Sequence, residues 1–163
     1  MDNRFQLLRD ATINTYPLFT LKGYITYAKL LSNYDGDTGD ILFLYNGLPM
    51  RMKARFNGYD TCEIKPLIND PNRDEKKRKA KEAKMRLWKL CTNMDDIKEH
   101  KTLIKIVCDD FDKYGRLLIM AFPEETDISN KNEDELFNIS INNQMIKEGH
   151  GYSYKGGTKE EFI

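Results

Sequence analysis

The sequence predicts an α+β fold that is mainly β, a five-stranded barrel with two to three helices. Short runs of β-branched and aromatic residues alternate with turn-forming residues, which is typical of strands in an antiparallel sheet. One segment near the middle of the chain has the three- and four-residue apolar spacing of an amphipathic helix. With 163 residues, 40% of them hydrophobic, the chain is long enough to bury the core of one domain.

The first part of the expected barrel is three strands joined by tight turns. Residues 22–34 mix β-branched with aromatic residues, residues 41–45 form an apolar run, and residues 50–56 alternate large apolar with basic residues. The polar residues 35–40 are typical of a turn, and Asn46-Gly47 is a strong hairpin signal. We therefore predict a β-meander.

A long helix is expected to follow this meander. Residues 64–73 contain two prolines and are expected to form a loop. From Asp74 onward, apolar residues recur at spacings of three and four, which leaves the lysines on the other faces. Asp74 and Glu75 at the start suit the positive end of the helix dipole.

Two more strands and a short helix complete the predicted order. Apolar runs at 103–108 and 117–122 predict the strands, and the acidic residues 123–138 are expected to form a loop. Ser140 is a suitable cap for a helix over 141–148 that ends at Gly149. Three strands, a helix and two strands, followed by a helix, is the order of an OB-fold barrel.

The chain ends are predicted to lie around one domain. Residues 1–21 are weakly patterned and are expected to be an N-terminal extension with one short helix near Phe5–Arg9, whereas residues 22–163 form the barrel domain. The sequence Thr158 to Glu161 has the pattern of a capping box and predicts the opening of a last helix.

Composition and charge indicate what kind of protein this is: whether it spans a membrane, where it is located and which surfaces are charged. No apolar run approaches the roughly 20 residues that span a bilayer, so no membrane partner is expected. The N-terminus lacks the layout of a signal peptide, which favours an intracellular protein, or a secreted one if a signal was removed. Three widely spaced cysteines are expected to be reduced thiols. The net charge of zero conceals a basic run at 76–89 and an acidic stretch at 124–135.

Carboxylates and guanidinium groups recur at the ends of the predicted strands. The turn Asp35-Gly36-Asp37-Thr38 precedes the second strand, and Arg55 lies near the end of the third. Asp60-Thr61-Cys62-Glu63 follows, and Arg116 comes later, after Tyr114-Gly115. Oxygen ligands for a hard cation, a spare carboxylate and two arginines are what phosphodiester cleavage requires. Each residue alone is ordinary for a turn or a surface, and only their combination points to this chemistry.

With these motifs the chain resembles the staphylococcal nuclease (thermonuclease-like) family over residues 24–150, including the late helix from Asn142 to Gly149. The resemblance implies a Ca²⁺-dependent nuclease that cuts both DNA and RNA. Asp37, Asp60 and the carbonyl of Thr61 would hold Ca²⁺, and Glu63 would take a proton from the attacking water. Arg55 and Arg116 would bind phosphate oxygens, and the products would end in 3′-phosphates.

The resemblance also implies residues that bind the rest of the substrate. Lys113 and Tyr114 would contact the neighbouring phosphate, and Tyr152 and Tyr154 would stack on a base. The expected partners are DNA and RNA, with single strands preferred, and the protein is expected to be a monomer. The chain departs from the family at Cys62, where the family has proline.

Two other interpretations remain open at this point. The alternative to a nuclease is a non-catalytic OB-fold module that only binds nucleic acid or a protein. A weaker alternative is an interaction domain that uses its basic and acidic surfaces. Retention of Asp37, Asp60, Glu63, Arg55 and Arg116 together favours the enzyme, because inactive modules tend to lose such residues.

Overall fold

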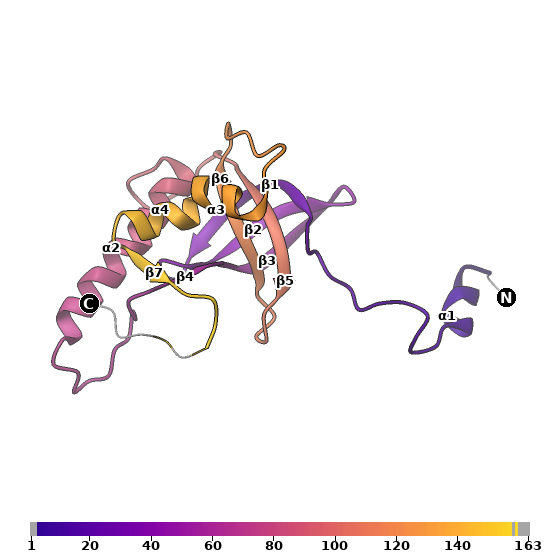
Figure 1. Ribbon diagram of the computed structural model, residues 1–163, viewed down its shortest axis with the longest axis horizontal. Helices are drawn as coiled ribbons and strands as arrows, with labels where there is room; N and C mark the ends of the chain where they lie inside the picture. The colour runs from indigo at the N-terminus through magenta and orange to yellow at the C-terminus, as the bar shows by residue number, and fades with distance from the viewer. Residues whose placement is uncertain (1–2, 158, 160–163) are drawn as a thin grey trace.

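A computed structural model describes residues 3–157 and residue 159 (Figure 1). The strands are β1 (Ile25–Asn33), β2 (Thr38–Tyr45), β3 (Leu48–Phe56), β4 (Tyr59–Thr61), β5 (Ile104–Phe111), β6 (Leu117–Pro123) and β7 (Gly151–Ser153). The helices are η1 (Asn3–Phe5), α1 (Gln6–Asp10), α2 (Arg73–Thr92), α3 (Glu133–Ile139) and α4 (Ile141–Lys147). No helix in the described part of the chain is long and apolar enough to span a membrane.

Five strands form a closed barrel in the order β1-β2-β3-β6-β5, which confirms the predicted α+β class and five-stranded barrel. Neighbouring strands are antiparallel except for β3 and β6, whose parallel pairing completes the barrel. This arrangement is consistent with an OB-fold. Buried residues alternate along β2, β5 and most of β6, because successive side chains point to opposite sides of the barrel wall.

Helices α2 and α4 pack against each other and against the barrel strands β1 and β6, and the two-stranded sheet of β4 and β7 contacts α4 (Figure 1). The buried face of α2 carries Ala80, Ala83, Leu87, Trp88 and Cys91. Asn142 attaches α4 to the barrel: its amide nitrogen donates to the carbonyls of Asn57 and Ile119, and its amide oxygen accepts from the Ala121 N–H. These contacts fix the position of β4 relative to the barrel, because Asn57 lies just before that strand.

The predicted acidic loop over 123–138 was wrong in its last third, where α3 begins at Glu133. Asn132 and Glu135 form a reciprocal capping box, and three acidic residues in the first turn suit the positive end of the helix dipole. The described residues therefore contain four α-helices instead of two to three. The short strand β4 was not predicted, and β2 begins at Thr38, inside the predicted turn.

Other local expectations are confirmed. The Ser140 side chain caps α4 by accepting from the Asn143 N–H, and Gly149 follows the helix with a φ of 77°.

The N-terminal segment leads away from the barrel to α1 (Figure 1), and Phe19 and Thr20 contact Tyr45 of β2 and Asp110 of β5. The predicted helix at Thr158–Glu161 falls mainly outside the described residues.

Candidate active site

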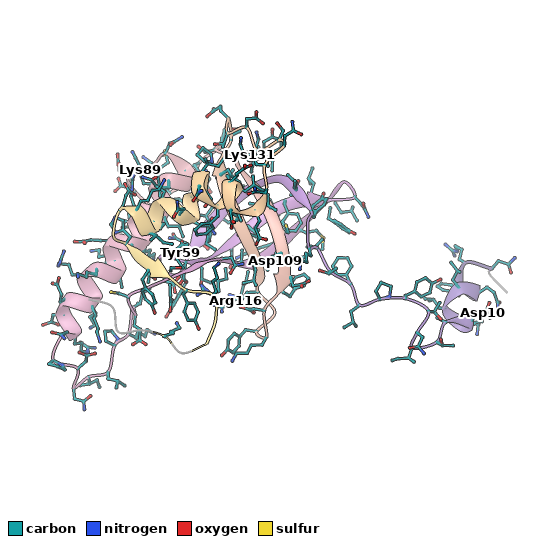
Figure 2. The ribbon with its side chains drawn as sticks, viewed as in Figure 1. Asp10, Tyr59, Lys89, Asp109, Arg116 and Lys131 are labelled. Atoms are coloured by element: carbon teal, nitrogen blue, oxygen red, sulfur yellow. The ribbon has the colours of Figure 1, made fainter. Side chains whose placement is uncertain are left out.

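Strand register brings the predicted site residues to one edge of the barrel. Thr38, next to Asp37, pairs with Arg55 across β2 and β3. Leu117, next to Arg116, pairs with Ala54 across the parallel strands β3 and β6. Segments that are far apart in sequence therefore present Asp37, Arg55 and Arg116 close to one another. Figure 2 labels Tyr59, on β4, and Arg116, the residue immediately before β6.

The Arg55 guanidinium lies between the two aspartates that were predicted to hold a cation. Its Nη1 is 3.2 Å from Asp37 Oδ2, and its Nη2 is 3.8 Å from Asp60 Oδ1. Nη2 also donates to the Tyr59 carbonyl at 3.2 Å. All three charged side chains are at most 11% exposed. Burial strengthens the electrostatic interactions within this group, because water screens them only weakly.

Burial, neighbouring charges and hydrogen bonding set the protonation of the two aspartates. Burial raises the pKa of Asp37 well above its ordinary value, and the nearby Asp35 raises it further, although Arg55 opposes the change. For Asp60, burial also acts to raise the pKa, but hydrogen bonding with Asp37 and with the Lys159 ammonium lowers it overall. The pair therefore resists carrying two negative charges unless additional positive charge is present.

These residues line a pocket of about 770 Å³. Nine of the ten predicted site residues line it, and they are Asp37, Arg55, Asp60, Thr61, Glu63, Lys113, Tyr114, Arg116 and Tyr154. Glu63 is exposed and lies in the segment that follows β4, whereas Asp37 and Asp60 are buried. The pocket thus combines a buried pair of carboxylates with a separate, solvent-accessible carboxylate.

The β5–β6 turn supplies the cationic wall of the pocket. Arg116 Nε donates to Asp112 Oδ2 at 2.7 Å, and the Asp112 carboxylate also accepts from the Arg116 and Tyr114 N–H groups. The Tyr114 ring lies 5.3 Å from the Arg116 guanidinium carbon and 5.1 Å from the Lys113 ammonium. Asp112 thus fixes Arg116 through Nε, and the terminal nitrogens of an arginine held this way are suited to bind phosphate oxygens.

The two late tyrosines take different positions. Tyr154 lines the pocket with its ring 5.7 Å from the Arg55 guanidinium carbon. Tyr152, the one predicted residue that is not among the pocket's lining residues, pairs with Asp60 across β4 and β7. Its hydroxyl donates to Asp60 Oδ2 at 3.2 Å. Tyr152 therefore contacts a predicted cation ligand directly.

A divalent cation fits the chemistry of the Asp37–Asp60 pair. The two carboxylates are buried together, and burial and the nearby Asp35 raise the pKa of Asp37 although Arg55 lies beside it, so further positive charge would stabilise the charged form of the pair. The Lys159 ammonium lies 3.1 Å from Asp60 Oδ2, so a cation already approaches this carboxylate. Within residues 3–157 and 159, no three His, Cys, Asp or Glu side chains are grouped as a metal site. The predicted ligand set contains only two side chains and needs the Thr61 carbonyl and water to complete it.

Several lining residues were not predicted as part of the site. They are Tyr34, Asp35, Thr38, Cys62, Ile64, Lys65, Gly157 and Lys159. Asp35, Thr38 and Cys62 are neighbours of predicted residues, and sequence adjacency was the signal that could have found them. No local pattern connects Lys159 with Asp60, which lies 99 positions earlier. Burial raises the pKa of the Cys62 thiol, which disfavours its reactive thiolate form.

No protein-family model matches the chain, and the search of curated proteins found no match.

Proposed function

We propose that the protein is a Ca²⁺-dependent nuclease that hydrolyses phosphodiester bonds of DNA and RNA and leaves 3′-phosphate ends. The observation that carries the proposal is the contact of Arg55 with both buried carboxylates, Asp37 and Asp60, inside a pocket that also holds Glu63 and Arg116. Buried charged groups with a shifted carboxylate pKa in a concave site are typical of functional sites.

In this proposal Asp37, Asp60 and the Thr61 carbonyl hold Ca²⁺, which neutralises charge on the phosphate when it is bound. Arg55 and Arg116 hold phosphate oxygens in the pocket and stabilise the charge that develops on them in the transition state. Their planar guanidinium groups can each contact two oxygens. The positive charge of Arg55 then serves the substrate as well as the aspartates.

Glu63 is the proposed general base. Its exposed carboxylate accepts a proton from a water molecule as the water oxygen forms a bond to phosphorus. The bond to the 5′-oxygen breaks, and this oxygen leaves with the bonding electrons and takes up a proton from solvent water to become a hydroxyl group. Tyr114 and Lys113 contact the adjacent phosphate of the substrate. Tyr154 and Tyr152 stack on a nucleobase of the substrate. Single strands are the preferred substrate in this proposal, because their bases are accessible for stacking on aromatic rings.

The test is a cleavage assay with end-labelled single-stranded DNA and RNA in Ca²⁺, in Mg²⁺ and in chelator, followed by analysis of the product ends. We expect cleavage of both substrates in Ca²⁺, none in chelator, and 3′-phosphate products. Salt-dependent binding without cleavage in excess Ca²⁺ would instead identify a binding module.

A further inference from the structure

Three consecutive backbone carbonyls in the turn that carries Asp37 each accept a hydrogen bond from a different part of the chain. Asn33 Nδ2, at the end of β1, donates to the Asp35 carbonyl at 3.0 Å. The Tyr59 hydroxyl, on β4, donates to the Gly36 carbonyl at 2.6 Å. The Phe56 N–H, at the end of β3, donates to the Asp37 carbonyl at 2.8 Å. This turn is therefore fixed from three sides.

Close packing restricts the same turn further. A Cβ atom on Gly36 would lie 2.8 Å from both Ala83 Cβ and Thr61 Cγ2, so only glycine fits there without a shift. Asn33 Nδ2 also donates to the Lys84 carbonyl at 2.8 Å, which connects the turn to the middle of α2. The backbone of the turn therefore has little room to move.

The Tyr59 hydrogen bond has a distinctive place in this arrangement. Tyr59 immediately precedes Asp60, and Gly36 immediately precedes Asp37. Their hydrogen bond thus joins the two chain segments that present the carboxylates, one residue before each of them. The Tyr59 ring is fully buried in the core, so its hydroxyl is held by packing as well as by the bond.

We infer that Tyr59 is a positioning residue, whose hydrogen bond to the Gly36 carbonyl sets the spacing of Asp37 and Asp60 and so increases the affinity of the pair for a divalent cation. The physical reason is preorganisation: ligands already held in place lose less conformational freedom on binding. The inference rests on the proposed function, since it assumes that the two carboxylates bind a cation.

The experiment compares Tyr59→Phe with the wild-type protein by isothermal titration calorimetry with CaCl₂ and by thermal unfolding in chelator. Phenylalanine keeps the buried ring and removes only the hydrogen-bond donor. Because the turn loses one of its three fixed points, we expect Ca²⁺ binding to weaken about tenfold, the size that corresponds to one buried hydrogen bond.

Tyr24→Phe is the matched control. The Tyr24 hydroxyl also donates to a backbone carbonyl, that of Leu44 at 2.9 Å, and neither residue lines the pocket. Both variants should lower the unfolding temperature, but only Tyr59→Phe should change the dissociation constant for Ca²⁺. If Tyr59→Phe lowers the unfolding temperature and binds Ca²⁺ as tightly as the wild type, Tyr59 is only structural and the inference is overturned.

Gly36→Ala keeps the inference testable should Tyr59→Phe fail to fold. Its added Cβ would meet Ala83 and Thr61 and so displace the turn, which should also weaken Ca²⁺ binding. Unchanged binding would show that the position of the turn does not matter and would overturn the inference. Where both single variants fold, the double variant should weaken binding less than the product of the two effects, because both act on one turn. Absence of Ca²⁺ binding to the wild type would refute the proposed cation dependence itself, together with the role of Tyr59.

Discussion

Two pockets of similar size differ in how their charges are compensated. The candidate active site, of about 770 Å³, contains Asp37 and Asp60 as a buried carboxylate pair with Arg55 between them. The second pocket, of about 670 Å³, is lined by residues from the C-terminal half of α2, the segment that leads into β5 and the segment that follows β6. Its lining residue Arg86 donates two hydrogen bonds, at 2.7 and 2.8 Å, to Glu148, which is not itself a lining residue.

The difference shows why concavity alone does not identify a site. Arg86, which lines the second pocket, and its partner Glu148 are both partly exposed, and hydrogen bonding to Arg86 lowers the pKa of Glu148. That carboxylate is stable in its charged form without a ligand. In the first pocket, the raised pKa of Asp37 shows that the charged form is costly as it stands. Proteins tolerate such a cost chiefly at functional sites.

The largest expected difference between the two pockets is the effect of Glu63→Gln in the candidate active site. Glutamine keeps the size of the side chain and removes the proton acceptor, so cleavage should fall roughly 10²- to 10⁴-fold while binding of single-stranded DNA changes little. Glu124→Gln, in the second pocket, is the control and should cleave at the wild-type rate. Initial cleavage rates and a fluorescence-anisotropy titration measure the two quantities. Near-normal turnover by Glu63→Gln would remove Glu63 from its proposed role.

Replacing an arginine with lysine should affect catalysis in the candidate active site but not in the second pocket. Arg116→Lys keeps the positive charge but replaces a planar fork that Asp112 holds in place. We expect a loss of about 10²- to 10³-fold in kcat, comparable to the removal of one transition-state donor. Arg86→Lys alters a lining residue of the second pocket that bonds to the Glu148 carboxylate at a similar distance, and it should leave kcat unchanged. Equal effects of the two substitutions on kcat would contradict a special role for the first pocket.

Asp37 is expected to lower the stability of the cation-free protein, although the proposed activity requires it. The folded-state pKa of Asp37 is raised, so without a cation this group binds its proton more tightly in the folded than in the unfolded state. Its contribution to stability is therefore greatest below pH 3.8 and is lost as pH rises through the raised folded value. Asp37→Asn removes this loss, and the cation-free variant should unfold a few degrees above the wild type at pH 7.

In the presence of Ca²⁺, the wild type should unfold at a higher temperature than Asp37→Asn. At 100 times its dissociation constant, a ligand stabilises the folded state by about 2.7 kcal/mol, and Asp37→Asn should lose most of this gain. Asp40→Asn is the control, because Asp40 lies on β2 in an ion pair with Arg51, whose side chain is mostly exposed, and should retain the calcium response. Calorimetric scans with Ca²⁺ and with chelator provide the comparison. A calcium-dependent rise in unfolding temperature that persists in Asp37→Asn would exclude Asp37 as a ligand.

Much of the first pocket could be predicted from the sequence because its parts lie at strand ends. Alternation and turn residues located β1, β2, β3, β5 and β6, and barrel closure then brought Asp37, Arg55 and Arg116 together. The three-residue strand β4 was missed because it is too short to show alternation and pairs only with β7. Helix α3 was missed because its acidic residues were interpreted as a loop, although its capping box was visible in the sequence.

Long-range contacts of single side chains could not be predicted. Tyr59 was interpreted neither as a strand residue nor as part of the site, because the partner of its hydroxyl is a backbone carbonyl 23 positions earlier. The same holds for Asn142, whose amide group reaches three backbone groups on the barrel. Backbone carbonyls and N–H groups are identical at every position, so the sequence carries no local sign of which one a side chain will contact.

The smallest expected effect concerns Lys159, whose ammonium group contacts Asp60 from an exposed side chain. A cation that binds Asp60 must compete with this ammonium group, so Lys159→Gln should strengthen Ca²⁺ binding by about two- to threefold, the range expected for an exposed ion pair. Lys155→Gln is the control, since this exposed lysine of the same segment does not line the pocket. Calorimetric titration at low and at high NaCl measures both variants. The gain should shrink at high salt, because screening already weakens the Lys159–Asp60 pair in the wild type; weaker binding by Lys159→Gln would mean that Lys159 supports the site instead of competing for it.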